Sequence, residues 1–250
     1  MAPCGSTKRG LAWPKENTDP VKLFCCDGSK VSWLYNWSPG QTTDCPLSFA
    51  PMQWNNVNID DLPAKLSDCN AEVLLGFNEP ELPDQSNMTA ELAANEWLRV
   101  IEPLRKERGI KCGSPGISSA GHAVGWLNDF LRRIKEGGSD VDFYCLHWYG
   151  SELGQFYDYI WSAYYQLPDQ KKPVWITEFA CTNWNESAPL DKGHVEDFAR
   201  ESCKYLDSLD WVEKYAWFGA MRNCGTVGKF ARMIDDEGCL TPLGKTYCGI

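Results

Sequence analysis

Two glutamates stand directly after apolar runs, where a carboxylate needs either a partner or a chemical task. Glu79 follows Val73–Asn78 and precedes Pro80, and Glu178 follows Val174–Thr177. An unpaired carboxylate beside buried strand residues is costly, so such a residue is either an ion-pair or capping group or a reactive group. A single glutamate in this setting favours the structural role. Two in matching settings favour a reactive pair, in which the surroundings keep one acid protonated and the other ionised.

The elements that would position this pair are short apolar, aromatic or β-branched runs that recur along the chain. Several are nearly continuous in hydrophobic residues, which is typical of parallel strands covered by helices. The eight runs are Lys8–Trp13, Val31–Trp37, Ala50–Trp54, Glu72–Asn78, Ile110–Ser114, Val141–Tyr149, Pro173–Phe179 and Trp211–Phe218.

Amphipathic helical patterns separate these runs. The clearest are Thr89–Arg105, with Thr89 as its N-cap, Ala123–Ile134 and Asp191–Leu209. Pro103 predicts a kink or an early end of the first of these helices. Shorter helices are expected at Ile59–Leu66, at Phe156–Gln166 and, for a turn or two, within Pro20–Cys26.

Eight strands alternating with helices predict a single (β/α)₈ barrel, an α/β fold, over residues 1–250. A doubly wound sheet is the alternative, but the Gly-rich nucleotide loops typical of that fold are absent. Glu79 and Glu178 would then end the fourth and seventh strands, which face each other across the mouth of a closed barrel. Carboxyl groups about 5 Å apart would support a covalent glycosyl intermediate, whereas about 9 Å would favour inversion.

Charge and cysteine content limit the class of protein. The net charge of −10 argues against nucleic acid and against an anionic membrane surface, and is compatible with a neutral or cationic ligand. The twelve cysteines include no C-x-x-C pair and the chain has only three histidines, so we expect disulfides and no structural zinc site. Disulfides would place the protein outside the reducing cytosol.

The location expected from these features is extracellular, with the cell wall as one possibility. The start, Met1–Gly5, lacks an apolar signal core, so we expect a mature chain whose signal peptide was replaced by an initiator Met. Glycosylation sequons begin at Asn36, Asn87 and Asn185. The last two lie in polar, loop-like stretches, whereas Asn36 lies in an expected strand.

The chain resembles known glycoside hydrolases in several motifs. Gly76–Pro80 (GFNEP) resembles the Asn-Glu-Pro motif of clan A glycoside hydrolases, and the wider set resembles family 128, a family of β-1,3-glucanases. The matching pieces are Lys8–Trp13, Tyr35–Trp37, Gly76–Glu81, His147–Tyr149 and Ile176–Ala180. The resemblance implies retaining, endo-acting hydrolysis of β-1,3-glucan, without metal or cofactor.

The same resemblance implies roles for individual residues. Glu79 would be the acid/base, Glu178 the nucleophile, and Asn78 would bind the sugar 2-hydroxyl, a bond that can strengthen in the transition state. Tyr149 ends the sixth strand and could donate to Glu178, which would keep that carboxylate ionised. His147 lies on the same strand face by period-two alternation, either as a partner of this group or as a core histidine.

Aromatic residues make up 13% of the chain, and many follow strands. Their rings can stack on the apolar faces of sugars, while Tyr and Trp also offer hydrogen-bond donors. Packing in the core is the alternative role, favoured for Trp97 and Trp126 at helical spacing. The further candidate sugar contacts are Trp13, Tyr35, Asn36, Trp37, Trp54, Trp148, Trp184 and Trp217.

Other classes of function remain to be weighed against hydrolysis. The first is a β-1,3-glucan oligosaccharide-binding protein on a barrel scaffold, with little turnover. A serine esterase would need G-x-S-x-G, and Cys112–Gly116 lacks the first Gly. A metalloenzyme is disfavoured because His122, His147 and His194 are scattered. The expected partner is a neutral polysaccharide, and nothing requires more than a monomer.

Overall fold

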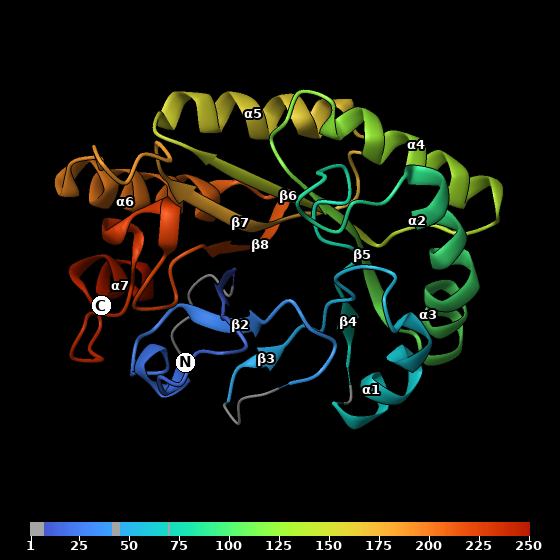
Figure 1. Ribbon diagram of the computed structural model, residues 1–250, viewed down its shortest axis with the longest axis horizontal. Coiled ribbons are helices and arrows are strands. Elements are labelled where there is room, and N and C mark those ends of the chain that lie inside the picture. Colours follow the sequence, from blue (N-terminus) through green and yellow to red (C-terminus); the bar gives the residue numbers. More distant parts are fainter. Residues whose placement is uncertain (1–7, 42–45, 70) are drawn as a thin grey trace.

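The computed structural model describes residues 8–41, 46–69 and 71–250. Among them, eight strands form a curled sheet in the order β3-β2-β1-β8-β7-β6-β5-β4, and every paired neighbour is parallel (Figure 1). The strands are β1 Arg9–Ala12, β2 Val31–Tyr35, β3 Ser48–Phe49, β4 Val73–Leu74, β5 Lys111–Ile117, β6 Phe143–Gly150, β7 Val174–Cys181 and β8 Val212–Trp217.

The two edge strands meet beyond their regular pairing, which completes the barrel. Met52 and Leu75 form a parallel bridge, in which Leu75 N–H donates to Pro51 O at 2.8 Å and Gln53 N–H donates to Leu75 O at 3.1 Å. The predicted (β/α)₈ architecture is confirmed. The third strand differs in its bounds. Ser48–Phe49 pairs with β2, whereas the predicted run, Ala50–Trp54, lies just after it and meets Leu75, the residue after β4, through this bridge.

Helices cover the outside of the sheet, with α4 and α5 along the top of Figure 1 and α2 and α3 at its right. The α-helices are α1 Leu62–Asp68, α2 Ala90–Glu96, α3 Glu102–Arg108, α4 Ala123–Glu136, α5 Leu153–Gln166, α6 Lys192–Ser208 and α7 Pro242–Cys248. Short 3₁₀ turns occupy Val21–Phe24, Ile59–Asp61, Gly225–Val227 and Lys229–Ala231. Thr89 and Asp191 cap α2 and α6 by accepting from Leu92 N–H and His194 N–H.

Of the two outcomes expected at Pro103, a kink or an early end of the helix, the early end does not occur. A π-turn at Trp97–Ile101 links α2 to α3, and the helical path continues to Arg108. Proline cannot donate a backbone hydrogen bond and its ring crowds the preceding turn. The wider π-turn just before Pro103 is a standard way to absorb such a defect without breaking the helix.

Large side chains fill the barrel interior because glycines on neighbouring strands leave room for them. The interior cluster includes Trp33, Phe143 and Trp175. A Cβ on Gly10 would lie 2.1 Å from the Trp33 ring, and one on Gly113 would lie 2.4 Å from the Phe143 ring. Alternation of large and absent side chains therefore sets the packing of this core.

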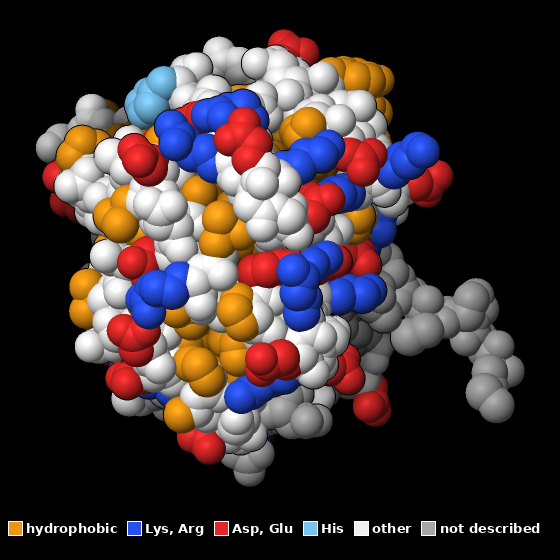
Figure 2. Space-filling model, turned by 90° about the vertical axis from the view of Figure 1, so that its right-hand side faces the viewer, with side chains coloured by type: hydrophobic (Ala, Val, Ile, Leu, Met, Phe, Trp, Pro, Cys, Tyr) orange, Lys and Arg blue, Asp and Glu red, His pale blue; other side chains and the backbone are white. Residues whose placement is uncertain are grey.

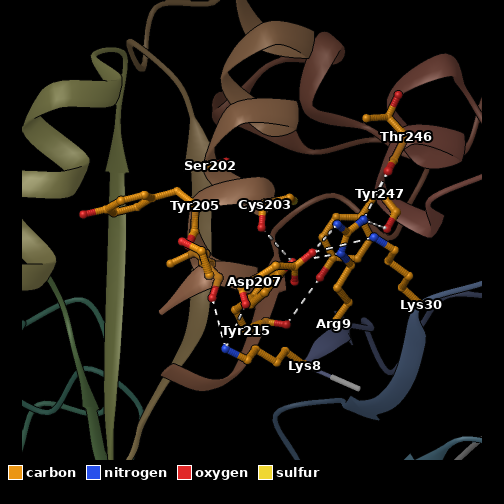
Figure 3. Close-up of polar contacts among 12 residues, drawn as sticks. Lys8, Arg9, Lys30, Ser202, Cys203, Tyr205, Asp207, Tyr215, Thr246 and Tyr247 are labelled. Atoms are coloured by element: carbon orange, nitrogen blue, oxygen red, sulfur yellow. Dashed lines mark hydrogen bonds and ion pairs between the residues drawn. The ribbon is translucent and has the colours of Figure 1, made fainter. Parts of the chain in front are cut away.

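A buried polar network joins the first strand to the last elements of the chain (Figure 3). The Arg9 guanidinium donates to Asp207 Oδ2 at 2.7 Å, to Tyr215 Oη at 2.8 Å and to Tyr247 O at 2.6 Å. These partners belong to α6, β8 and α7, so a single side chain ties four elements together. Arg9 is only 5% exposed, so its charge depends on these partners.

Ten of the twelve cysteines are described, and no disulfide joins any two of them. Cys4 and Cys45, like Met1–Gly5, lie outside the described residues. Cys112, Cys145 and Cys203 are buried within apolar clusters, where a thiol packs as a small hydrophobic group. The prediction that most cysteines form disulfides is therefore not supported among the described residues.

The outer surface over α2–α4 mixes both signs of charge, as Figure 2 shows. On α4, Arg132 lies 2.5 Å from Asp129 and 2.6 Å from Glu136. Exposed pairs of this kind contribute little to stability. None of the described helices combines the length and apolar character that crossing a membrane requires.

Candidate active site

A cavity of about 760 Å³ opens at the carboxyl ends of the strands. This is the end of a (β/α)₈ barrel where reactive groups gather. Each strand, or the segment that follows it, contributes a residue to the cavity wall. In strand order these are Pro14, Trp37, Trp54, Glu79, Ser118, Tyr149, Glu178 and Phe218.

Glu178 lies on β7 and is 5% exposed. Its Oε1 accepts from Trp37 Nε1 at 2.7 Å and from Tyr35 Oη at 3.2 Å, and its Oε2 accepts from Tyr149 Oη at 2.6 Å. An ionised carboxylate is an acceptor only, so three convergent donors favour the charged form. Burial, together with the negative charge of Glu178, raises the pKa of Tyr35 and Tyr149 well above the ordinary value, so both hydroxyls remain donors.

Glu79 follows β4 and is 8% exposed. Its backbone has a positive φ of 42° and its N–H donates to Gly116 O at 2.7 Å. A left-handed conformation is uncommon for a non-glycine residue, and such strain clusters at functional sites. Among the described residues, the side chain of Glu79 contacts a single donor, His147, whose Nδ1 lies 3.0 Å from Oε1.

His147 lies on β6, is fully buried and stands between the two glutamates. Its Nδ1 is 3.0 Å from Glu79 Oε1 and 3.8 Å from Glu178 Oε2, while its Nε2 is 2.9 Å from Thr177 Oγ1. Burial alone would lower the pKa of His147, but the charges of Glu178 and Glu79 outweigh it and raise the pKa to about 9. The two carboxylates therefore favour the imidazolium form of the ring.

One carboxylate oxygen of Glu79, one of Glu178 and a ring nitrogen of His147 all lie within 4.8 Å of one another. Among the described residues this is the group of His, Cys, Asp and Glu close enough to be considered for a metal ion. A metal needs a neutral imidazole, whereas His147 is held protonated by its two neighbours. The trio suits acid–base chemistry better than metal binding.

Asn78 lines the cavity beside Glu79 and is 3% exposed. Its Nδ2 donates to Gln85 Oε1 at 3.2 Å, which fixes the orientation of the amide. Its Oδ1 is buried and has no hydrogen-bond partner among the described residues. A buried acceptor without a donor is costly, so Asn78 offers a place for a ligand hydroxyl.

Aromatic rings form the walls of the cavity. Tyr149 packs against Trp184 with ring centroids 5.1 Å apart, and Trp37 packs against Phe218 at 5.9 Å. Trp184 is 53% exposed, which leaves much of its ring open to a ligand. Trp37 and Trp184 also have positive φ angles, of 54° and 56°. Backbone strain at these positions and at Glu79 is concentrated in the cavity wall.

Four residues expected at the barrel mouth lie elsewhere. Trp13 packs on Phe24, Trp148 stacks on Phe198 at 5.6 Å, and the Trp217 indole donates to Ala231 O at 2.8 Å. All three rings are 5% exposed or less, because they point outward from the strands into the helix layer. Asn36 is 3% exposed and orders its own loop by donating to Gly40 O. Tyr35 is buried beneath the cavity, where its hydroxyl donates to Glu178 Oε1.

Some residues of the site were not singled out from the sequence. Thr177 was visible only as a neighbour of Glu178, and Phe218 only as an aromatic residue after a strand. Gln85 lies in the loop that leads to α2, where no pattern marks a functional residue. Leu82 and Met221 also line the cavity from loops.

Comparison with known proteins agrees with this geometry. The family model described as the glycosyl hydrolase catalytic core matches residues 10–247. The alkali-sensitive linkage protein 1 of Schizosaccharomyces pombe is 33% identical over 97% of this chain. The aligned region is 44% of that relative, so the chain spans less than half of its length.

Solved structures of glycoside hydrolase family 128 superpose over nearly the whole chain. A subgroup V exo-β-1,3-glucanase from Cryptococcus neoformans has a TM-score of 0.79 at 30% identity and covers 96% of this chain and 98% of its own. A subgroup I endo-β-1,3-glucanase from Amycolatopsis mediterranei, in complex with laminaritriose, has a TM-score of 0.80 at 27% identity and covers 98% and 99%. The chain therefore belongs to the glycosyl hydrolase catalytic core family, and its structure is similar to those of family 128 glycoside hydrolases.

Proposed function

We propose that the protein hydrolyses β-1,3-glucan with retention, using Glu79 as acid/base and Glu178 as nucleophile. The observation that carries this proposal is a pair of carboxylates with oxygens within 4.8 Å of each other in unlike surroundings. Retaining enzymes have carboxyl groups about 5–5.5 Å apart, whereas inverting enzymes need about 6.5–9.5 Å to admit a water molecule.

In the first step, Glu178 attacks the anomeric carbon while Glu79 transfers its proton to the departing glycosidic oxygen. The carbon–oxygen bond to the leaving sugar breaks and a glycosyl ester with Glu178 forms. The donors Trp37, Tyr35 and Tyr149 keep Glu178 ionised and hold it in place for this attack. Asn78 Oδ1 accepts from a sugar hydroxyl at the same centre.

In the second step, Glu79 is a carboxylate and removes a proton from water. The water oxygen attacks the anomeric carbon, the ester bond breaks and Glu178 leaves as a carboxylate. Two inversions at one carbon restore the original β configuration. Glu79 ends the cycle protonated.

The choice of β-1,3-glucan rests on the character of the cavity and on the relatives. Trp37, Trp54 and Trp184 offer ring faces in a cavity suited to a neutral sugar chain. The family 128 structures are named as β-1,3-glucanases, and two are complexes with glucose or laminaritriose.

We propose endo attack, although the similar structures include both exo and endo enzymes. A second hollow of about 570 Å³ lies beside the main cavity, and Gly225 lines both. Loop residues around Glu186 and Arg222 form its walls. This hollow gives a glucan chain room to continue past the glutamates. Endo action predicts mixed oligosaccharides early in laminarin digestion, whereas release of a single small product would contradict it.

The mechanism is tested by laminarin digestion with Glu178→Gln and Glu79→Gln. Each variant keeps the side-chain shape but removes the carboxylate, so we expect reducing-sugar release to fall by more than about 10³-fold. Glu107→Gln, at an exposed position on α3 away from both hollows, is the control and should remain active. An active Glu178→Gln enzyme would contradict the mechanism. Tight binding of laminari-oligosaccharides without turnover by the wild type would favour the binding-protein alternative.

We also propose that the protein acts outside the cell as a monomer. Asn87 and Asn185 are exposed and begin glycosylation sequons, which supports passage through the secretory route. In a eukaryotic host, secreted protein should lose apparent mass on treatment with an N-glycosidase. Retention inside the cell without glycan would contradict this location.

A further inference from the structure

Both ring nitrogens of His147 are engaged, and they connect the two glutamates through different elements. Nδ1 lies 3.0 Å from Glu79 Oε1, and Nε2 lies 2.9 Å from Thr177 Oγ1. Thr177 is the chain neighbour of Glu178 and is 1% exposed. Among the described residues, no other hydrogen bond to either ring nitrogen of His147 is recorded.

An irregularity in β7 allows Thr177 to reach this position. In a regular strand, consecutive side chains point to opposite faces. The register between β7 and β8 shifts between Ile176 and Phe179, and β6 pairs with β7 after a similar shift at Leu146 and His147. Thr177 and Glu178 therefore both face the barrel interior, while Phe179 packs in the helix layer. Bulges next to active sites re-aim side chains in this way.

We propose that Thr177 is a positioning residue, whose hydroxyl accepts from His147 Nε2 and thereby keeps this ring as a permanent cation between Glu79 and Glu178. With Nε2–H satisfied, Nδ1–H can donate to Glu79 at the same time. The inference rests on the proposed function and deepens it, because it says what holds the charge at the centre of the two-step reaction.

A fixed imidazolium keeps the buried group neutral through both stages. Before attack, Glu79 is protonated, Glu178 is negative and His147 is positive, with its cation held by Glu178, whose Oε2 lies 3.8 Å from Nδ1. In the glycosyl ester, Glu178 is uncharged, Glu79 is negative and His147 is still positive. An isolated net charge in a buried site is costly, so a cation that persists through both stages avoids that cost at each one.

The other groups around His147 are consistent with this role. Glu79 and Glu81 lie on the segment after β4, and Glu178 lies on β7; all three carboxylates raise the pKa of His147, against the lowering effect of burial. The nearby phenols, Tyr35 on β2 and Tyr149 on β6, have pKa values raised well above the ordinary value by burial and by Glu178, so they stay neutral. The described charges that act on the ring are thus all carboxylates.

Titration of the ring nitrogens by ¹⁵N NMR tests the proposal directly. The chain has three histidines, and His147→Gln identifies the signal of His147. We expect the wild type to remain an imidazolium through neutral pH. Thr177→Val keeps the shape but leaves Nε2–H without an acceptor, so the midpoint should fall by about 1–2 pH units. Thr177→Ser keeps the hydroxyl and should restore the wild-type midpoint.

Laminarin kinetics give a second readout. In Thr177→Val, the positive charge 3.8 Å from Glu178 Oε2 is lost, so kcat/KM should fall about tenfold and its acid limb should move to higher pH. Thr177→Ser should restore both. A Thr177→Val enzyme that loses activity but keeps the His147 titration would overturn the proposal, as would a wild-type His147 that is neutral at neutral pH.

The proposed function and the positioning role of Thr177 can be contradicted independently of each other. If the titration shifts as expected but the wild type does not cleave laminarin, the positioning role of Thr177 stands and the proposed function falls. If laminarin is cleaved but the titration of His147 is the same with Val at position 177, the function stands and the positioning role falls.

Discussion

Glu178 accepts hydrogen bonds from three side chains, whereas Glu79 meets a single described donor on a strained backbone. Hydrogen bonds to the charged form of a carboxyl group stabilise that form, so the unlike surroundings support the roles proposed for Glu178 as nucleophile and Glu79 as acid/base. The assignment of roles thus follows from the neighbours of each glutamate, and the neighbours can be changed one at a time.

Tyr149→Phe removes the shortest of the three bonds to Glu178. A hydrogen bond to a charged group contributes about 1.5–3 kcal/mol, so kcat/KM should fall by about 10- to 100-fold. The carboxylate loses a donor to its charged form, so the acid limb of the kcat/KM profile should move to higher pH. Tyr165→Phe, at a 69% exposed position on α5, is the matched control and should change neither quantity. An unshifted acid limb in Tyr149→Phe would show that the phenol does not tune Glu178.

The raised pKa of His147 predicts that the protein loses folding stability as the pH becomes alkaline. Its pKa is about 9 in the folded protein and about 6.5 in an unfolded chain. The added stability is fully present below about pH 6.5 and is lost as the pH rises through about 9, and it amounts to about 3 kcal/mol. Urea unfolding across this range should show the loss in the wild type and a flatter dependence in His147→Gln. Equal slopes in both proteins would contradict the assigned charge.

At the scale of elements, strand alternation decides which aromatic residues reach the cavity. The face of β2 that carries Trp33 and Tyr35 continues to Trp37, which lines the wall. On β6, the alternation that turns Tyr149 inward turns Trp148 outward into the helix layer. Consecutive side chains of a strand point to opposite faces. Had this rule been applied to each strand, Trp148, Trp13 and Trp217 would not have been expected to contact sugar.

Irregular elements explain what the sequence could not predict. The register shift in β7 places Thr177 and Glu178 on one face, against the alternation rule. Gln85 reaches Asn78 from a loop whose path follows no periodic pattern. The π-turn before Pro103 is another such feature, at a place where the sequence predicted a kink or an early helix end. Such features depend on tertiary packing, which a pattern read along one chain does not contain.

Packing between β5 and β6 predicts a specific effect of Gly116→Ala. A Cβ at Gly116 would lie 2.6 Å from Nε2 of His147 and would displace a ring that is buried on all sides. We expect activity on laminarin to fall by about 10- to 100-fold, because a small displacement of catalytic groups is costly. Gly125→Ala adds a methyl group that meets nothing within 4 Å and should leave activity intact. Full activity in Gly116→Ala would mean that the position of His147 is unimportant.

At the scale of the whole molecule, alternating apolar runs and helices were sufficient to predict the barrel and to place Glu79 and Glu178 at its mouth. Seven of the eight described strands lie within or overlap the expected runs, and the third lies just before its run. Cysteine count was a poorer guide, because Cys112, Cys145 and Cys203 serve as core side chains on separate elements. The number of cysteines in a chain does not show whether they form disulfides or pack in the core.

The buried network between the first strand and the last elements of the chain predicts that Arg9 is critical for stability. Arg9 joins β1 to α6, β8 and α7 through buried hydrogen bonds (Figure 3). Arg9→Met would leave Asp207 without this charged partner, and breaking a buried pair in this way costs about 3–5 kcal/mol. Urea unfolding measures the loss. Arg132→Met, which breaks exposed ion pairs on α4, is the control and should change stability little. A small loss of stability in Arg9→Met would show that this network is not needed to hold β1 to the last elements of the chain.

The stereochemistry of the first product tests the central claim most directly. Proton NMR of a laminari-oligosaccharide digestion, recorded before mutarotation, separates the α and β anomers of the new reducing end. Carboxylate oxygens within 4.8 Å of each other predict that the β anomer appears first, through a glycosyl ester on Glu178. Initial release of the α anomer would contradict the account, because it would require a water molecule between the carboxylates and a single displacement.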